Sequence, residues 1–497
     1  MDAIQTLAQE AAQATAGNNL YETYKRQWRF LLESYVGGIE YRRAQHLTKY
    51  QLETESEYNA RLLTTPLDNH CRSVVSVYNS FLFRENPKRD LGQLEQLPQI
   101  QDLLRDSDFE GRSLDNFMKE VSTWSSVFGH CWVMVSKPNV GAMTLADEQA
   151  MGVRPYLSLL TPMVVLDWSF RRLPSGRYDL DYLKYVEDVN GDVETVREWW
   201  PNRIVTRVVD TKEQIIRETI EEVNELGVIP AVISYAARNT VRGIGVSDIA
   251  DIADVQKFIY NATSEIDQSI RLDSHPSLVK TPETQAGIGA GSIIHMPENL
   301  DPGLKPYVLE FSGASVDKII NTIDHSIASI DKMANIGAVR ATEAKTMSGV
   351  AMETEFQLLN ARLAEKADNL ELAEEQIWKL ICAYMGYTWD GVIDYPGSFN
   401  IRDTGSEIQQ LKTARETATD PRVWAEIDQR IIDWLGVDLI DEEPMLHAMT
   451  MPGEDRIEHI QEMVMSGLTD QQILDLHPEI NQSDIDQAKQ QLLNQGE

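Results

Sequence analysis

Hydrophobic residues recur every three or four positions in three long stretches of the chain, which is the spacing of one face of a helix. The longest stretch also repeats every seven residues, at Phe356, Leu363, Leu370 and Ile377, with Lys366 interrupting a second row. A helix there would be roughly 55 Å long, because each helical residue adds about 1.5 Å. The patterns predict long helices at 249–271, 315–335 and 349–386.

A different pattern fills the segment before the first of these helices. From about Cys131 to Asp210, β-branched and aromatic residues gather in short runs that turn residues separate. Asn190-Gly191-Asp192 suits a tight hairpin. We therefore predict an antiparallel β-rich region, and a smaller β-like insert at 272–314 between the first two long helices.

The first 92 residues have the pattern of shorter helices. Tyr21–Tyr35 is aromatic-rich and ends at Gly37-Gly38, while Pro66–Phe83 carries apolar residues at helical spacing, with Pro66 placed in the first turn. The tail after residue 400 is polar and helical in pattern. Together these elements predict an α+β fold.

Composition limits the possible partners. The chain of 497 residues has 78 acidic and 45 basic residues, a net charge of −33, so most of its surface would repel nucleic acid. Its 3 cysteines are scattered without a CxxC pair, which argues against a disulfide framework or a thiolate metal site. No segment approaches the roughly eighteen uncharged apolar residues of a membrane helix. We expect no membrane contact and folding in the cytoplasm.

Two glycine-rich segments invite comparison with phosphate loops. Gly287–Gly291 and Gly243–Gly245 both lack the Walker spacing and a βαβ context, so turns explain them better. A set of possible metal ligands lacks any known zinc spacing. That set is His447, Glu454, Asp455 and His459.

Carboxylate pairs such as Glu221-Glu222 and Glu374-Glu375 fit solvated helix faces in so acidic a chain. The sequence therefore predicts no catalytic residue, metal or cofactor. A hydrolase that uses paired carboxylates in the β-rich region stays open as an alternative.

The link before the longest helix is unusual. In residues 337–347 small residues predominate, and Arg340 and Lys345 are the only cations. Such a segment has little to bury, so it is either an ordinary exposed loop or a mobile loop that faces something large and polar.

Several local phrases occur in a fixed order along the chain. They are Trp28, Tyr35, Gly37 and Tyr41-Arg42, then Glu57-Tyr58-x-x-Arg61 and Phe83-x-x-x-Pro87, then Asn224-Glu-Leu-Gly227-Val-Ile-Pro230, and finally Ser348-Gly-Val-Ala-Met352. With a helix, β insert and helix between the last two, this order resembles that of tailed-bacteriophage portal proteins.

The resemblance implies a portal fold with an antiparallel β-rich wing, a small β clip insert and a helical C-terminal crown. Its parts would fall on this chain as follows: 1–92 the N-terminal helical part of the wing, 93–248 the β-rich wing, 249–271 stem helix 1, 272–314 the clip, 315–335 stem helix 2, 336–348 the tunnel loop, 349–399 the long wing helix and 400–497 the crown.

The resemblance also implies a function without catalysis. Portals form twelve-subunit rings at one capsid vertex of the virion, and double-stranded DNA passes through the ring during packaging and ejection. The expected partners are the terminase large subunit, a head-tail adaptor, and the major capsid and scaffolding proteins, with assembly in the bacterial cytoplasm. A tail adaptor or baseplate component is the alternative within virions.

Two groups of site residues follow. The tunnel loop would touch DNA transiently through Arg340, Lys345, Thr346 and Met347. Stem helices would pack against each other and against adjoining subunits through Ile252, Ile259, Ile266, Ile320, Ile323 and Ile327.

Overall fold

The computed structural model describes residues 2–138, 151–274, 314–340 and 349–399, with parts of 277–309 and a few short pieces beyond 400. Residues 1–400 form one compact unit and residues 401–497 a second. Most of the expected crown at 400–497 therefore lies outside the described residues. The long helices and the sheets described below all belong to the first unit.

Helices occupy the N-terminal part of this unit, and polar side chains cap the starts of the second, fourth and fifth of them. Gly37, with φ of +65°, ends the second helix, in the left-handed region that glycine tolerates. The Asn69 side chain accepts a hydrogen bond from the Arg72 amide, so the fifth helix begins at His70 and the predicted start near Pro66 is wrong. The helices are α1 (Asp2–Thr15), α2 (Asn19–Val36), α3 (Gly38–Arg43), α4 (Glu55–Thr64) and α5 (His70–Leu82).

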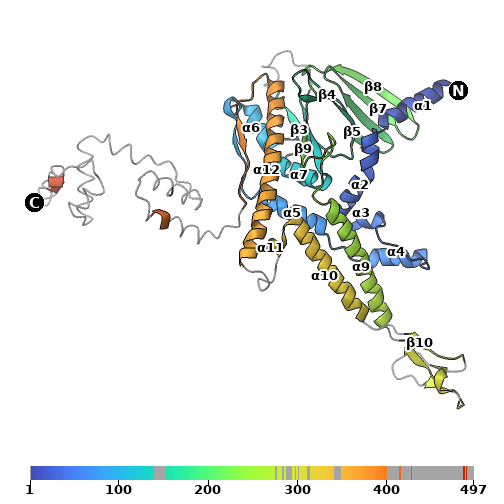
Figure 1. Ribbon diagram of the computed structural model, residues 1–497. Helices are drawn as coiled ribbons and strands as arrows, with labels where there is room; N and C mark the ends of the chain where they lie inside the picture. Colours follow the sequence, from blue (N-terminus) through green and yellow to red (C-terminus); the bar gives the residue numbers. More distant parts are fainter. Residues whose placement is uncertain are drawn as a thin grey trace, which may run out of the picture. The chain divides into compact units, whose positions relative to one another are not determined.

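The β-rich region contains an antiparallel sheet whose strands follow chain order, β4-β5-β6-β7-β8. The predicted hairpin is confirmed: Asn190 pairs with Val193, and Gly191 between them has φ of +64°. Helix α1 packs on β7 and β8 (Figure 1). The strands are β4 (Val165–Arg172), β5 (Tyr178–Asn190), β6 (Val193–Trp199), β7 (Arg203–Asp210) and β8 (Ile215–Val223).

A second sheet, ordered β3-β2-β9, lies at the centre of the hydrophobic core. All but the last residue of β2 are buried, as expected for a strand covered on both faces. Helix α7 begins after a Ser113 cap and packs on β2 and β9. The elements are η1 (Gly92–Leu94), α6 (Pro98–Arg105), α7 (Leu114–Phe128), β2 (His130–Ser136), β3 (Tyr156–Leu160) and β9 (Ala231–Tyr235).

Two long antiparallel helices, α9 (Ala250–Ser274) and α10 (Ala314–Ala334), pack side by side and extend away from the sheets (Figure 1). Short paired strands lie at their far end, so the helix, β insert and helix order predicted from the sequence is confirmed. The described parts of this insert are β10 (Ser277–Val279), β11 (Gln285–Ala286), β12 (Ile294–His295), η2 (Pro302–Leu304) and β13 (Tyr307–Leu309).

The longest helix is α12 (Gly349–Met385), 37 residues that pack on α5, α7, β2 and β9 (Figure 1). Its predicted seven-residue stripe is buried at Leu363, Leu370 and Ile377. A short helix that the sequence did not predict, α11 (Gly337–Arg340), precedes it. After α12 the chain returns as β14 (Val392–Asp394), which pairs with β1 (Lys88–Asp90).

Candidate functional site

The α9–α10 pair is the element that the sequence singled out for packing between subunits. Ile252 and Ile259 are 2% and 3% exposed, and Ile266 is partly buried. On α10, Ile323 and Ile327 pack partly buried against the core, whereas Ile320 is 42% exposed. A single chain thus buries the stripe near the base of the pair and leaves Ile320 largely open to solvent.

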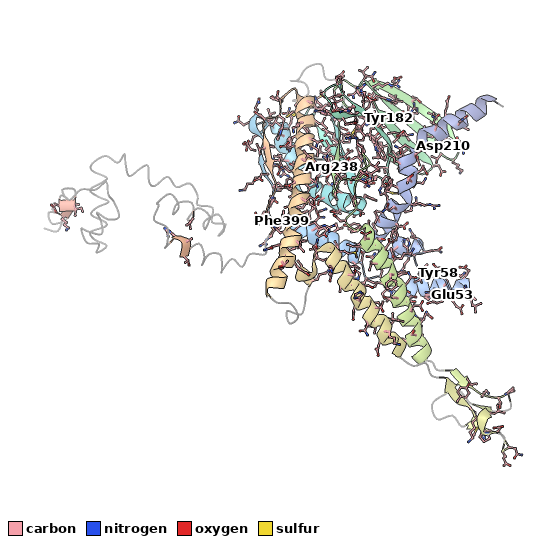
Figure 2. The ribbon with its side chains drawn as sticks, viewed as in Figure 1. Glu53, Tyr58, Tyr182, Asp210, Arg238 and Phe399 are labelled. Carbon is pink, nitrogen blue, oxygen red and sulfur yellow. The ribbon has the colours of Figure 1, made fainter. Side chains whose placement is uncertain are left out.

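Helix α4 and the turn before it brace the side of α9 (Figure 2). The buried Arg61 guanidinium donates to both carboxylate oxygens of Glu53 at 2.8 Å and to the Ser264 hydroxyl on α9 at 3.0 Å. Tyr50 donates to Glu265 at 2.6 Å. The Glu57-Tyr58-x-x-Arg61 phrase therefore fixes one flank of α9.

A buried ion pair joins the start of α9 to the long helix. Lys366 Nζ lies 2.5 Å from an Asp248 carboxylate oxygen and 2.9 Å from the Ser126 hydroxyl. Arg362 donates to Asp248 at 3.2 Å and to the Met333 carbonyl, also at 3.2 Å. Burial of the Asp248 carboxyl opposes ionisation, but Lys366 and Arg362 outweigh it and hold its pKa below the usual range. Arg362 thus ties the start of α9 to the end of α10.

The base of the expected tunnel loop is anchored at Arg340. Its guanidinium lies 2.8 Å from the Asp331 carboxylate on α10 and also contacts the Ser73 hydroxyl on α5. The Tyr78 hydroxyl donates to the Ala334 carbonyl at 2.7 Å. These contacts hold the segment from which the loop departs. The other loop residues of the prediction, Lys345, Thr346 and Met347, lie outside the described residues.

One carboxylate pair differs from its expected role. Glu374 is fully buried and its carboxylate pairs with Arg89 at 2.5 Å, while Tyr395 donates to it at 2.6 Å. Neighbouring Glu375 pairs with Lys379 near the surface of the same helix. The prediction of a solvated face is therefore wrong for Glu374, which links α12 to the β1–β14 pair. Glu221 and Glu222 are exposed, but on strand β8 rather than on a helix.

The Gly243–Gly245 segment lets two chain segments approach each other closely and does not form a phosphate loop. A Cβ on Gly245 would lie 1.9 Å from the Gly129 carbonyl oxygen, and Gly243 has φ of +84°. Gly287–Gly291 and the four-residue set at 447–459 lie outside the described residues.

Metal ligands and membrane-spanning helices are both missing from the part of the chain that the structure describes. There, no group of three or more His, Cys, Asp or Glu side chains could hold a metal ion. Within the same residues, no helix has the length and apolar content to cross a bilayer.

The solved structures to which this chain is similar include the three that follow, whereas no curated protein matches it. "Neck of empty GTA particle computed with C6 symmetry" is 12% identical with a TM-score of 0.42, over 79% of this chain and 99% of that one. "Virion of native gene transfer agent (GTA) particle" is 12% identical with a TM-score of 0.41, over 72% and 89%. "Neck of native GTA particle computed with C12 symmetry" is 12% identical with a TM-score of 0.41, over 80% of this chain and 98% of that one. No functional conclusion follows from similarity this low.

Identity comes from a family model. The model described as "Phage portal protein, SPP1 Gp6-like" matches residues 19–410, from the start of α2 to beyond β14. Proteins of this family are structural components of the virion and not enzymes, which decides against the hydrolase and against other virion parts. The chain belongs to the SPP1 Gp6-like family of phage portal proteins, and its role is that of a portal, or head-tail connector, of a virion.

Proposed function

We propose that the chain is one subunit of a twelve-membered ring at a single capsid vertex, through which double-stranded DNA is packaged and ejected. The observation that carries this proposal, beside family membership, is the α9–α10 pair. It projects from the core with small strands at its tip, and its outer faces carry exposed charged side chains together with exposed Phe258, Ile270 and Ile320. A helix pair of this kind can surround a bore once it is repeated around an axis.

Each part of the chain then has a place in the ring. The α9–α10 pair is the stem, and the insert at 272–314 is the clip, which docks the terminase large subunit and later the head-tail adaptor. The wing, built from the N-terminal helices, the sheets and α12, faces the major capsid and scaffolding proteins. The ring assembles in the cytoplasm of the host bacterium, and ATP hydrolysis belongs to the terminase.

The charge of the chain suits a channel that DNA passes without sticking. Twelve copies carry a formal charge of about −400, which repels phosphates over most of the wall. Contacts through cations would add salt-dependent affinity and slow the DNA. We propose that residues 341–348 touch DNA transiently through Lys345, Thr346 and Met347. Arg340 contributes at the base of the loop, where Asp331 orients it.

The test is the mass of the purified protein, measured by native mass spectrometry or light scattering over a range of salt and protein concentrations. Twelve copies of the 56.3 kDa chain give a particle of about 680 kDa. A closed ring with that mass, or with a neighbouring whole number of subunits, supports the proposal. Monomers or dimers under every condition would overturn it.

A further inference from the structure

The exposed face of α9 carries acidic residues at a regular spacing. Asp251 and Glu265 are fourteen residues apart, with exposed Phe258 midway between them and Asp254 close by. Residues seven apart share one face of a helix. The cations of α9 are engaged elsewhere, because Lys257 lies over the Phe30 ring and Arg271 pairs with Asp267. We call Asp251, Asp254 and Glu265 the acidic line.

The exposed face of α10 carries basic residues at the same spacing. Lys318, His325 and Lys332 are seven residues apart and all exposed, and we call them the basic line. Within the described residues, neither lysine has an ion-pair partner, and the same holds for Asp251 and Asp254. Among the described residues, α9 thus presents carboxylates and α10 presents lysines that no ion pair within the chain neutralises, while Glu265 accepts a hydrogen bond from the Tyr50 hydroxyl of its own chain.

The two lines match level by level. The pair is antiparallel, and Arg362 bridges Asp248, just before α9, to the Met333 carbonyl at the end of α10, so the two base ends lie together. Asp251, Phe258 and Glu265 are 1, 8 and 15 residues from the start of α9 at Ala250. Lys332, His325 and Lys318 are 2, 9 and 16 residues from the end of α10 at Ala334. At each of these three levels, the α9 residue and the α10 residue differ by one residue, about 1.5 Å, in their distance from the base of the pair.

We propose that the acidic line of one subunit docks on the basic line of the next copy of this chain. The pairs are Asp251 with Lys332 and Glu265 with Lys318, while Phe258, 50% exposed, packs on His325 between them. This inference rests on the proposed ring, in which rotation about an axis along the stem keeps each level at its own height. The contact is head-to-tail, as closure of a ring requires, and the two helix faces are complementary in charge.

A third line shows why this pairing is selective. Asp317 and Asp324 are exposed on α10 one residue before Lys318 and His325, which turns them by about 100° around the helix. An α9 acidic line that met them would place like charges together, so repulsion disfavours that orientation. Asp317 and Asp324 therefore provide a matched control on the same helix.

Cysteine cross-linking tests whether Phe258 of one subunit lies opposite His325 of the next copy. The native cysteines Cys71, Cys131 and Cys382 are buried, so they contribute little background. Oxidation of the F258C/H325C variant should give a ladder of covalent oligomers. The F258C/K318C variant, whose second cysteine lies one heptad away, about 10.5 Å along the helix, should give none. A wild-type ring combined with only monomer bands for F258C/H325C overturns the inference and leaves the portal assignment standing.

Charge exchange tests the pairing. The K318E/K332E variant should need at least about tenfold more protein to assemble, since two exposed ion pairs per interface become repulsive. Adding D251K/E265K should restore assembly, and Y50F, which removes the hydrogen bond that Glu265 accepts within its own chain, controls for the loss of that contact. D317K/D324K alone should leave assembly unchanged. Failure of the exchange to restore a ring that the wild type forms overturns the proposed pairs. Absence of a wild-type ring overturns the proposed function and this inference together.

Discussion

At the scale of single residues, Lys366 explains the interruption in the apolar stripe of α12. It is almost fully buried, and its ammonium group contacts the Asp248 carboxylate and the Ser126 hydroxyl. Removing one partner of a buried pair leaves a charge without compensation, which costs far more than loss of a surface pair. Lys366 therefore fixes where the stem helix begins against the long helix.

Replacing Lys366 by methionine should lower the free energy of unfolding by about 3 kcal/mol, because Asp248 keeps only Arg362 as a charge partner. Urea denaturation at pH 7 measures this loss. Lys379 on the same helix, half exposed and paired with Glu375, is the control, and Lys379→Met should cost less than about 1 kcal/mol. Equal losses for the two substitutions would show that the buried ion pair stabilises the fold no more than the surface pair does.

His130 makes stability depend on pH. The side chain is fully buried, and burial lowers its pKa to about 3, below the 6.5 of a free histidine. Between these values the unfolded chain binds a proton that the folded chain does not, so stability falls as pH falls from about 6.5. His130 alone should account for a loss of about 2 kcal/mol from pH 7 to pH 5, and His46 and His70, whose pKa values burial also lowers, add to the loss.

The substitution His130→Gln should reduce the loss of stability between pH 7 and pH 5 by about 2 kcal/mol in urea denaturation, whatever it does to stability at pH 7. The exposed residue His295, outside the proposed subunit interface, provides the control, and His295→Gln should retain the full wild-type slope. A wild-type slope in His130→Gln would mean that other groups cause the dependence.

At the scale of elements, the sequence predicted the bounds of helices that bury one apolar face. Helices expected at 249–271, 315–335 and 349–386 end within three residues of α9, α10 and α12, because each stripe packs on one side only. The start of α5 differs from the prediction because the Asn69 cap overrides the apolar pattern. Helix α11 was missed because four residues are too few to show a period.

Gly245 marks the crossing of two chain segments. Alanine there should cost about 3 kcal/mol, because its Cβ would meet the backbone of Gly129, which cannot rotate away as a side chain could. Thermal unfolding measures the change. Gly397, where an added Cβ would have no neighbour within 4 Å, is the control, and Gly397→Ala should be close to neutral. A near-neutral Gly245→Ala would contradict the close approach.

At the scale of the whole molecule, contacts between distant segments lay beyond the reach of sequence patterns. Lys366 and Asp248 are 118 residues apart, and Arg89 and Glu374 are 285 apart. Nothing local distinguishes Glu374 from the solvated Glu375 beside it. The ordered local phrases predicted the portal family, which the family model confirms, whereas no sequence pattern links the segments that meet at the junction of α9, α10 and α12.

The tunnel loop makes a prediction about DNA. Lys345→Glu should reduce the amount of DNA packaged or retained per particle while the ring still assembles, because the loop would then repel phosphates. Lys345 is a sharper target than Arg340, whose reversal would also break the ion pair with Asp331. Lys119→Glu, on the exposed face of α7, controls for the change of net charge, because Lys119 has no ion-pair partner among the described residues. Unchanged packaging by Lys345→Glu would show that Lys345 does not contact DNA during packaging.

Cryo-electron microscopy of the purified assembly tests the ring most directly. We expect a closed annulus whose central bore is bounded by α9 and α10, with the clip at one end and the wing spread radially outside. Particles without a bore, in which the outward faces of α9 and α10 are covered within one self-contained chain, would contradict the proposed ring.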